Sequence, residues 1–261
     1  MSAVANKVVI VTGASAGIGR ATAVSFAQAG ATVVVTARRE PRLETLMSEL
    51  AQYPGEHLAV VGNIQKEAFA QALISQVVDE LGRVDIVVNN AGVGQQHSVA
   101  NIPSSALETV FKTNLFGLIY VTQAAVAQMK RQGGGHLVNV SSIVGQRPFP
   151  QGAVYSASKT AVNFISRGLR MELRQHNIRV TTVYPGLTAT EFAQARLGEP
   201  ADNRFGLRGV KPERVAKAIV KSVQNGRSEC YATWFDWAFT HLNRLFPRTL
   251  DRLFTLLAKS S

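Results

Sequence analysis

Tyr155 and Lys159 stand four residues apart in a segment with helical spacing, and together they could transfer a proton. Residues i and i+4 of a helix project from one face, so the phenol and the ammonium would be neighbours. A phenol with its ordinary pKa of about 10 exchanges protons poorly near neutral pH. A nearby cation favours the phenolate and would lower that pKa. The pair predicts acid–base chemistry, although tyrosine and lysine also meet on amphipathic helices that have no such role.

A glycine-rich turn near the amino end could bind a phosphate. Residues 12–19 read TGASAGIG, after a short apolar run and before a helical pattern. Glycines let the backbone approach a pyrophosphate closely, and a helix N-terminus offers amide groups and the positive end of its dipole. The same spacing also suits a tight turn that binds nothing.

These motifs, taken together, resemble those of the short-chain dehydrogenase/reductase family. The turn at 12–19 matches the family's TGxxxGxG, and residues 89–92 match its NNAG. Further matches follow in the family's order: Asn114 within a helix, Ser142 after a strand, the Tyr155–Lys159 pair, and Pro185-Gly186 with Thr190 close behind. The resemblance covers residues 7 to about 192.

The resemblance implies a catalytic role for four residues. Tyr155 would be the general acid in carbonyl reduction and the base in alcohol oxidation. Ser142 would hydrogen-bond the substrate oxygen and the developing oxyanion. Lys159 would lower the pKa of Tyr155 and hold the ribose hydroxyls of the nicotinamide nucleotide. Asn114 would position a water that links Lys159 to solvent; the alternative is a helical Asn that bonds a backbone group.

The resemblance also implies a dinucleotide site, with residues that follow successive strands. The candidates are Gly13, Ser15, Gly17, Ile18, Gly19, Arg38, Arg39, Asn63, Ile64, Asn90, Ala91, Gly92, Tyr155, Lys159, Pro185, Gly186, Leu187, Thr188 and Thr190.

The end of the second predicted strand indicates which dinucleotide binds. NAD-binding folds place an acid there for the ribose 2′-hydroxyl, whereas NADP-binding folds place an arginine. Here residues 31–36 run into Ala37, Arg38 and Arg39. A guanidinium fork suits a phosphate dianion, so we expect NADP(H), with Ser15 as a further phosphate ligand. The alternative is a pair of exposed surface arginines.

Two positions depart from the family's pattern. Asn63 stands where the family usually has an Asp beside the adenine, and its carbonyl would still accept from the adenine amino group. Tyr184 precedes Pro185, where bacterial ketoacyl-carrier reductases usually have a small residue. The second departure weakens a role in fatty-acid synthesis without excluding it.

The hydrophobic pattern predicts one α/β domain over residues 1–261. Buried strands are expected at 7–11, 33–36, 58–61, 84–88, 136–140 and 179–184. Helices are expected at 18–29, 42–50, 68–81, 104–131, 155–176 and 212–224. This alternation favours a Rossmann-type, doubly wound parallel sheet with its ligand at the carboxyl ends of the strands.

Two segments lie outside that alternation. Residues 191–210 contain three Gly residues and one Pro residue and are interpreted as a lid loop; with Gln95 and the 143–152 loop they would set substrate choice. Residues 230–261 are expected to form a helical extension, with Trp234, Trp237, His241 and Leu245 at helical spacing and a second stripe after Pro247. The extension could cover the substrate, pack on a partner subunit, lie on a membrane surface as a basic amphipathic helix, or be disordered.

Composition excludes several other classes of protein. With 46% hydrophobic and 17% charged residues, the chain of 261 residues can build a large core and is not disordered. One cysteine and five scattered histidines exclude a disulfide framework and favour no metal site. The net charge of +11 comes without any nucleic-acid-binding motif, so no nucleic-acid partner is expected. No secretory signal or long apolar run is found, so the cytoplasm is expected.

The leading hypothesis is an NADP(H)-dependent carbonyl reductase or alcohol dehydrogenase that acts on a hydrophobic substrate. A 3-oxoacyl-[acyl-carrier-protein] reductase is the second hypothesis, and an NADPH-binding sensor or scaffold without turnover is the third. The family usually pairs its two long helices between subunits, so a homotetramer or homodimer is expected.

Overall fold

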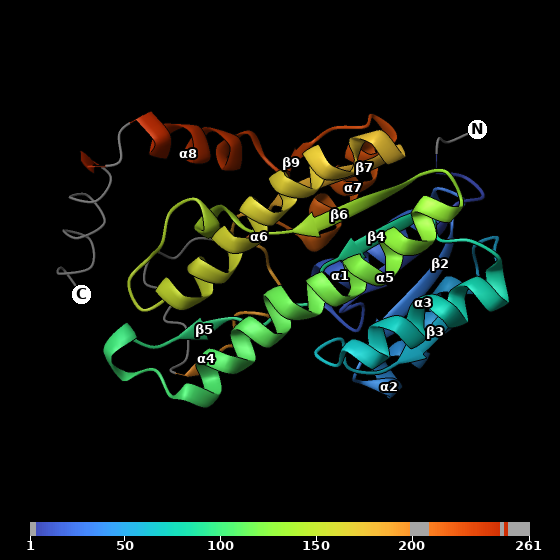
Figure 1. Ribbon diagram of the computed structural model, residues 1–261. Helices are drawn as coiled ribbons and strands as arrows, with labels where there is room; N and C mark the ends of the chain where they lie inside the picture. The colour runs from blue at the N-terminus through green and yellow to red at the C-terminus, as the bar shows by residue number, and fades with distance from the viewer. Residues whose placement is uncertain (1–3, 199–208, 246–247, 250–261) are drawn as a thin grey trace.

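A seven-stranded parallel sheet forms the centre of the molecule (Figure 1). The computed structural model describes residues 4–198, 209–245, 248 and 249. Within that part, the strand order is β3-β2-β1-β4-β6-β7-β9, and every pairing is parallel. The seven strands are β1 (Val8–Thr12), β2 (Thr32–Ala37), β3 (Leu58–Val61), β4 (Ile86–Asn89), β6 (Gly135–Val140), β7 (Ile178–Tyr184) and β9 (Glu229–Tyr231). The predicted doubly wound α/β fold is confirmed.

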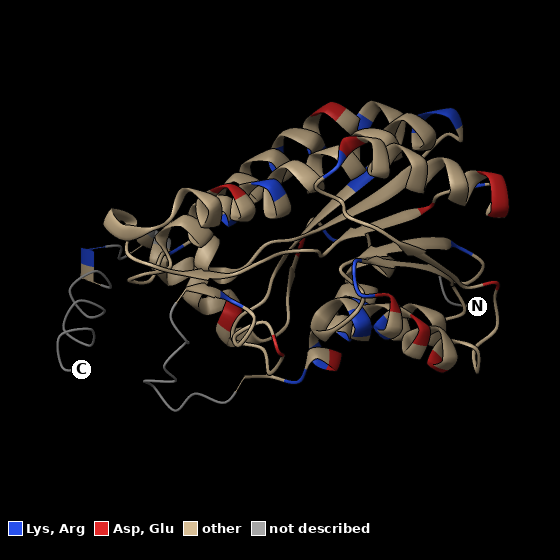
Figure 2. Ribbon diagram, turned by 90° about the horizontal axis from the view of Figure 1, so that it is seen from below, with Lys and Arg blue, Asp and Glu red and all other residues tan. Residues whose placement is uncertain are grey.

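Helices cover both faces of the sheet, which explains the continuous apolar runs of its strands. The helices are α1 (Gly17–Gln28), α2 (Glu40–Leu50), α3 (Glu67–Leu81), α4 (Ser104–Phe111), α5 (Gly117–Arg131), α6 (Ala153–Leu173), α7 (Pro212–Gln224) and α8 (Trp234–Leu245). α1, α2 and α7 bury their apolar sides in one core cluster, and α3, α5 and α6 contribute to the other. Charged residues lie mostly on the helices and connections, and the strands are almost free of them (Figure 2).

The predicted helix at 104–131 is divided by a π-helical turn, η2 (Lys112–Phe116), between α4 and α5. Such turns insert one extra residue into the helical hydrogen-bond pattern and are frequent at functional sites. The 28-residue span is long and apolar enough to cross a membrane. However, Val121, Ala125 and Met129 are buried in the core, so this span packs against the sheet.

The other boundaries lie close to the predicted ones, with two additions. β9 was not predicted, and it extends the sheet beside β7. Two short strands, β5 (Gln95–Gln96) and β8 (Leu197–Gly198), pair separately from the main sheet. The predicted stripe after Pro247 lies outside the described residues.

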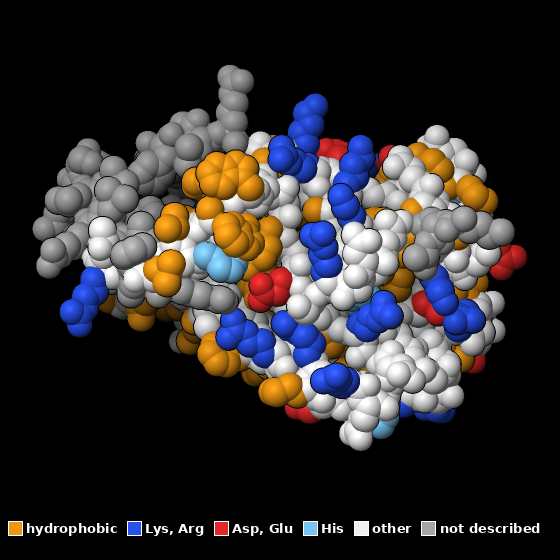
Figure 3. Space-filling view, turned by 90° about the horizontal axis from the view of Figure 1, so that it is seen from above, with side chains coloured by type: hydrophobic (Ala, Val, Ile, Leu, Met, Phe, Trp, Pro, Cys, Tyr) orange, Lys and Arg blue, Asp and Glu red, His pale blue; other side chains and the backbone are white. Residues whose placement is uncertain are grey.

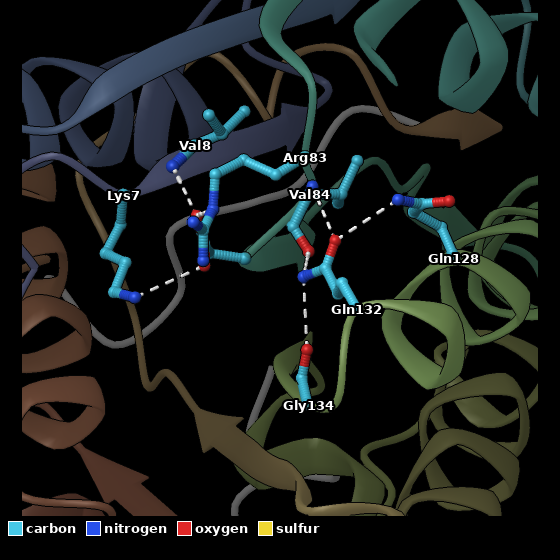
Figure 4. Close-up of polar contacts among 8 residues, drawn as sticks. Lys7, Val8, Arg83, Val84, Gln128, Gln132 and Gly134 are labelled. Carbon is cyan, nitrogen blue, oxygen red and sulfur yellow. Dashed lines mark hydrogen bonds and ion pairs between the residues drawn. The ribbon is translucent and has the colours of Figure 1, made fainter.

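A polar cluster at the amino ends of β1 and β4 fixes the relation of these two central strands (Figure 4). The Asp85 carboxylate accepts from the Val8 amide at 3.0 Å, from Arg83 at 2.6 and 2.8 Å, and from Lys7 at 3.3 Å. Burial raises the pKa of Asp85, but Arg83, the Val8 amide and Lys7 together hold it below its ordinary value. This cluster lies at the opposite edge of the sheet from the motif-bearing turns, so we assign it a structural role.

Candidate active site at the carboxyl edge of the sheet

The glycine-rich turn lies where the strand order reverses, between β1 and β4. Gly13 and Gly17 have φ angles of +65° and +56°, which favour glycine. A Cβ on Gly13 would lie 2.7 Å from the Ala91 Cα, and one on Gly19 would lie 2.4 Å from the Gly13 carbonyl oxygen. The turn after β1 and the turn after β4 therefore pack backbone against backbone, which side chains at these glycines would prevent.

Thr12 and Asn90 join the same two turns by hydrogen bonds. The Thr12 hydroxyl accepts from the amides of Asn90 and Ala91 at 3.0 and 3.1 Å. The Asn90 side-chain amide donates to the carbonyls of Thr12 and Gly13 at 2.9 and 3.2 Å. Asn90 was predicted to bind the cofactor, and here it shapes the turn that would do so. Thr12 was not among the predicted residues, although it opens the recognised motif.

Arg39 points to the glycine-rich turn and also to the segment after β7. Its guanidinium donates to the Ser15 hydroxyl at 2.9 and 3.2 Å. It also forms an ion pair of 2.6 Å with Glu191, which Arg42 contacts at 2.5 Å. The two arginines lower the pKa of Glu191, so this carboxylate is charged at neutral pH. Arg38 is exposed at the end of β2. The structure thus brings Arg39 and Ser15 together as predicted, and it adds Glu191 and Arg42.

The turn after β3 carries Asn63 and Ile64. The Asn63 side-chain carbonyl accepts from the Gln65 amide at 3.1 Å, which closes an Asx turn. Ile64 is buried, and a Cβ on Gly117 would lie 2.7 Å from its Cδ1. Both residues lie at the carboxyl edge of the sheet, and their contact with an adenine remains a prediction.

Ser142, Tyr155 and Lys159 meet beside the ends of β6 and β7. Ser142 lies close enough to the Tyr155 hydroxyl to oppose the effect of burial on the pKa of the phenol. The Ser142 hydroxyl also donates to the Pro185 carbonyl at 3.3 Å and accepts from the Val144 amide at 3.3 Å. The Lys159 Nζ lies 5.9 Å from the centre of the Tyr155 ring and donates to the Val140 carbonyl at 2.8 Å. The spacing predicted from the sequence is therefore realised as one cluster.

The pKa values of the cluster differ in part from the sequence-based expectation. Burial raises the pKa of Tyr155 to about 12, against smaller opposing effects of Arg196 and Ser142. Lys159 was expected to lower that pKa, but burial of the phenol outweighs the neighbouring charges. Burial also lowers the pKa of Lys159 to about 8. Near neutral pH the phenol thus keeps its proton and the amine is mostly charged.

Asn114 lies in the π-helical turn η2 and joins the turn after β4 to α6. Its Oδ1 accepts from the Val93 amide at 2.7 Å, and its Nδ2 donates to the Val93 carbonyl and to Ser158 at 3.0 Å each. The backbone-bonding alternative is therefore observed. A Cβ on Gly92 would lie 3.2 Å from the Asn114 Oδ1 and 3.5 Å from the Lys159 Nζ, so a glycine allows this approach. The water-positioning role of Asn114 remains a prediction.

The structure describes residues 191–198, 209 and 210 of the predicted lid, and Phe192 lies against the catalytic cluster. The Phe192 ring centre is 5.8 Å from that of Tyr155. Leu197 pairs with Gln95 in the small β5–β8 sheet, and Arg196 donates to the Gln96 side chain at 3.4 Å. Phe192 and Arg196 were not predicted individually, because their placement depends on this two-residue pairing.

The helical extension contacts both loops that border the cluster. The Asp236 carboxylate packs against Gly186, where a Cβ would lie 2.0 Å from the Asp236 Oδ1. Asn243 donates to the Gln146 carbonyl at 2.7 Å and accepts from Arg147 at 2.9 Å. Helix α8 therefore fixes the Pro185-Gly186 turn and the 143–152 loop. Sequence reasoning missed Asp236, whose one signal was its place in a Thr-x-x-Asp capping pattern.

The residues of this edge fit a dinucleotide. The N-cap of α1 is Ala16, which offers no side-chain cap, and the first turn of α1 carries no acid. The first amides of such a helix lack partners within the helix and attract an anion. Ser15 and Arg39 add donors next to this position.

Comparison with known families decides the assignment of this site. The short chain dehydrogenase family model matches residues 7–200, which is most of the chain. The chain is a short-chain dehydrogenase. As an oxidoreductase of this family, it combines the observed fold with the Ser142, Tyr155 and Lys159 cluster.

Relatives and solved structures agree with this assignment. The 3-oxoacyl-[acyl-carrier-protein] reductase FabG of Thermotoga maritima is 36% identical, over 82% of this short-chain dehydrogenase and 89% of the relative. An alcohol dehydrogenase from Thermococcus sibiricus, complexed with 5-hydroxy-NADP, superposes with a TM-score of 0.77 at 28% identity, covering 86% and 95% of the two chains. A short-chain dehydrogenase/reductase from Burkholderia phymatum, in complex with NAD, gives 0.86 at 23% identity, covering 96% and 97%, which shows the shared fold.

Proposed function

We propose that this short-chain dehydrogenase transfers a hydride between NADP(H) and a ketone or aldehyde, or the corresponding secondary alcohol. The observation that carries the proposal is the meeting of Ser142, Tyr155 and Lys159 in one cluster, with the Lys159 Nζ 5.9 Å from the centre of the Tyr155 ring. The bound nicotinamide would supply or accept the hydride. The protein must then add a proton donor, a hydrogen-bond partner for the oxyanion and a cation.

In the reducing direction, Tyr155 donates its phenolic proton to the substrate oxygen. The raised pKa of Tyr155 supports this direction because the phenol is protonated at working pH. Ser142 hydrogen-bonds the same oxygen and stabilises the charge that develops on it. Lys159 stabilises the phenolate that remains, and its buried position strengthens this effect. Oxidation uses the same groups in reverse, with Tyr155 as the base.

Arg39 and Ser15 support the preference for NADP(H). The guanidinium already donates to the Ser15 hydroxyl, so the two would form one site for the 2′-phosphate. Arg38 is exposed beside them and can add a second cation. An acidic residue, which would favour the free 2′-hydroxyl of NAD, is absent at the end of β2, where Ala37 stands.

A hydrophobic substrate fits the walls around Tyr155. Phe192 lies against Tyr155, and Phe149 of the 143–152 loop stacks on Phe239 of α8, with ring centres 6.3 Å apart. Val93 and Ile143 are half-buried beside the same turns and remain candidates for the pocket wall.

A 3-oxoacyl-[acyl-carrier-protein] reductase is the second candidate function. The FabG relative and the net charge of +11, which suits an acidic carrier protein, support it. Activity with acetoacetyl thioesters that exceeds activity with free ketones would favour this candidate.

A carbonyl panel with NADPH and NADH in parallel tests the proposal. We expect loss of nicotinamide absorbance with NADPH and at least one apolar ketone or aldehyde, and slower loss with NADH. Tight NADPH binding without turnover on any carbonyl would instead favour a sensor or scaffold.

We also propose that the chain forms a homotetramer or homodimer through its long helices. On α6, Phe164 and Met171 are seven residues apart on one outer face and are mostly exposed. A second copy would remove this apolar surface from water. A monomer in light scattering at micromolar concentration would contradict this proposal.

A further inference from the structure

Helix α8 buries two polar side chains and leaves most of its large apolar side chains exposed. Asp236 is 4% exposed and Thr240 is fully buried. Trp234 is 77% exposed, Phe235 60% and Leu245 70%. Trp237 and Leu242 are about half exposed on the same helix. This distribution is the reverse of the usual one for a surface helix, which buries its apolar face.

The inward contacts prevent α8 from rotating to bury these aromatic side chains. Thr233 and Asp236 form a capping box, with side chain to amide distances of 3.0 and 3.1 Å. Asp236 also packs against Gly186, and Asn243 is hydrogen-bonded to Gln146 and Arg147. Rotation would break these buried hydrogen bonds without replacement. The outward apolar face is therefore held in place by the fold.

A set of cations borders this apolar face. Arg214, Lys221 and Arg227 line one groove together with Trp234 and Trp237. Lys211 and Lys217 are also exposed on or next to α7. The acids of this region are Glu213, on the first turn of α7, Glu229, which lines the same groove and accepts from the Tyr231 hydroxyl, and the buried Asp236 of α8. Viewed from above, hydrophobic side chains gather at one end of this face, and Lys and Arg side chains lie beside them (Figure 3).

We propose that this face of α8 docks the protein on an anionic lipid surface. Indole and phenyl side chains partition into the interface between lipid headgroups and acyl chains, and Lys and Arg at its border attract anionic headgroups. The cationic border distinguishes this occupant from a second copy, because identical cationic borders would repel one another across a symmetric contact. The outer face of α6, with the exposed Phe164 and Met171, is the face that we assign to a second copy.

Intrinsic fluorescence tests the proposal directly, because the two tryptophans of the chain both lie on α8. The full chain is mixed with vesicles of phosphatidylcholine alone or with phosphatidylglycerol. We expect solvent-exposed emission without vesicles, and a blue shift with acrylamide protection only when phosphatidylglycerol is present. Bromine-labelled acyl chains should quench the shifted emission.

Matched variants in vesicle flotation separate the apolar contribution from the charge. Trp234→Ser/Phe235→Ser and Lys221→Glu/Arg227→Glu should each reduce the floated fraction about tenfold. Val99→Ser, at a similarly exposed apolar residue, and Lys66→Glu/Lys130→Glu should leave it unchanged. Circular dichroism and NADPH binding confirm that each variant is folded.

Three results would overturn the proposal. The first is no flotation with vesicles of either composition, and the second is flotation that the α8 variants retain. The third is tryptophan emission that is already blue-shifted and protected from acrylamide without lipid. If the third result came with a smaller oligomer for Trp234→Ser/Phe235→Ser, the cover of the face would be a second copy. If the mass of the oligomer were unchanged in this variant, the cover would be the chain's own terminal segment.

Discussion

The Glu191 carboxylate lies 2.6 Å from the Arg39 guanidinium, the same group that donates to Ser15. The segment after β7 thereby places its own anion beside the position proposed for the 2′-phosphate. Two anions cannot both keep the full set of Arg39 contacts, so Glu191 and the coenzyme compete for it.

Replacing Glu191 should therefore tighten NADPH binding. Glu191→Gln removes the competing charge, and the ion pair is partly exposed, so we expect NADPH affinity to rise about two- to fivefold. NADH affinity should change little, and Glu40→Gln, at an exposed acid of α2, serves as the control. Titration of nucleotide fluorescence measures both. Weaker NADPH binding would instead show that Glu191 supports the bound coenzyme.

Removing the Arg39 guanidinium should reverse the coenzyme preference. In Arg39→Ala, the phosphate loses a charge-assisted donor, and the expected fall in NADPH affinity is about tenfold to a hundredfold. Affinity for NADH should remain within about twofold, since NADH carries no 2′-phosphate. Equal losses for both nucleotides would contradict our assignment of the 2′-phosphate site.

Carbonyl reduction should slow as the pH rises through about 8. Lys159 has its pKa lowered to about 8 by burial, so above this pH the amine loses the charge that stabilises the phenolate of Tyr155. Below it, the amine is charged and the phenol, with a pKa near 12, is protonated. The pH dependence of kcat with saturating NADPH checks this. A rate that stays level up to about pH 10 would exclude Lys159 as the titrating group.

Asp85→Asn should destabilise the fold without changing the chemistry of the site. The variant weakens the hydrogen bonds to Arg83 and Lys7, and we expect a loss of about 1–3 kcal/mol in the free energy of unfolding at neutral pH. The native pKa of Asp85 is lowered, so its contribution is present above the unfolded pKa and is lost as the pH falls through the native pKa. The difference in unfolding free energy between wild type and variant, measured by urea unfolding, should become smaller at acid pH. Asp79→Asn, at an exposed acid of α3, should have little effect.

The strands and the catalytic cluster could be predicted because their signals are local. Each buried strand is a short apolar run. Tyr155 and Lys159 are neighbours because they lie one turn apart on the same helix. The π-helical turn at Asn114 could not be predicted, because it depends on hydrogen bonds to Val93 from another element. The spacing of apolar residues changes little through a π-helical turn, so the sequence pattern does not reveal it.

Contacts between segments that are distant in the chain could not be predicted from the sequence either. Glu191 meets Arg39, and Asp236 meets Gly186, only once the sheet order and helix α8 are fixed. β9 has three residues, too few to show a strand pattern in the sequence, and its extended structure depends on its pairing with β7.

Replacing Tyr155 by Phe tests the central claim most directly. The variant keeps the ring, which packs against Phe192, and removes only the hydroxyl beside Ser142. We predict that NADPH affinity stays within about twofold while the rate of NADPH oxidation with the best carbonyl substrate falls by about a hundredfold or more. If Tyr155→Phe turned over at the wild-type rate, Tyr155 would not be the proton donor and our account of this site would be wrong.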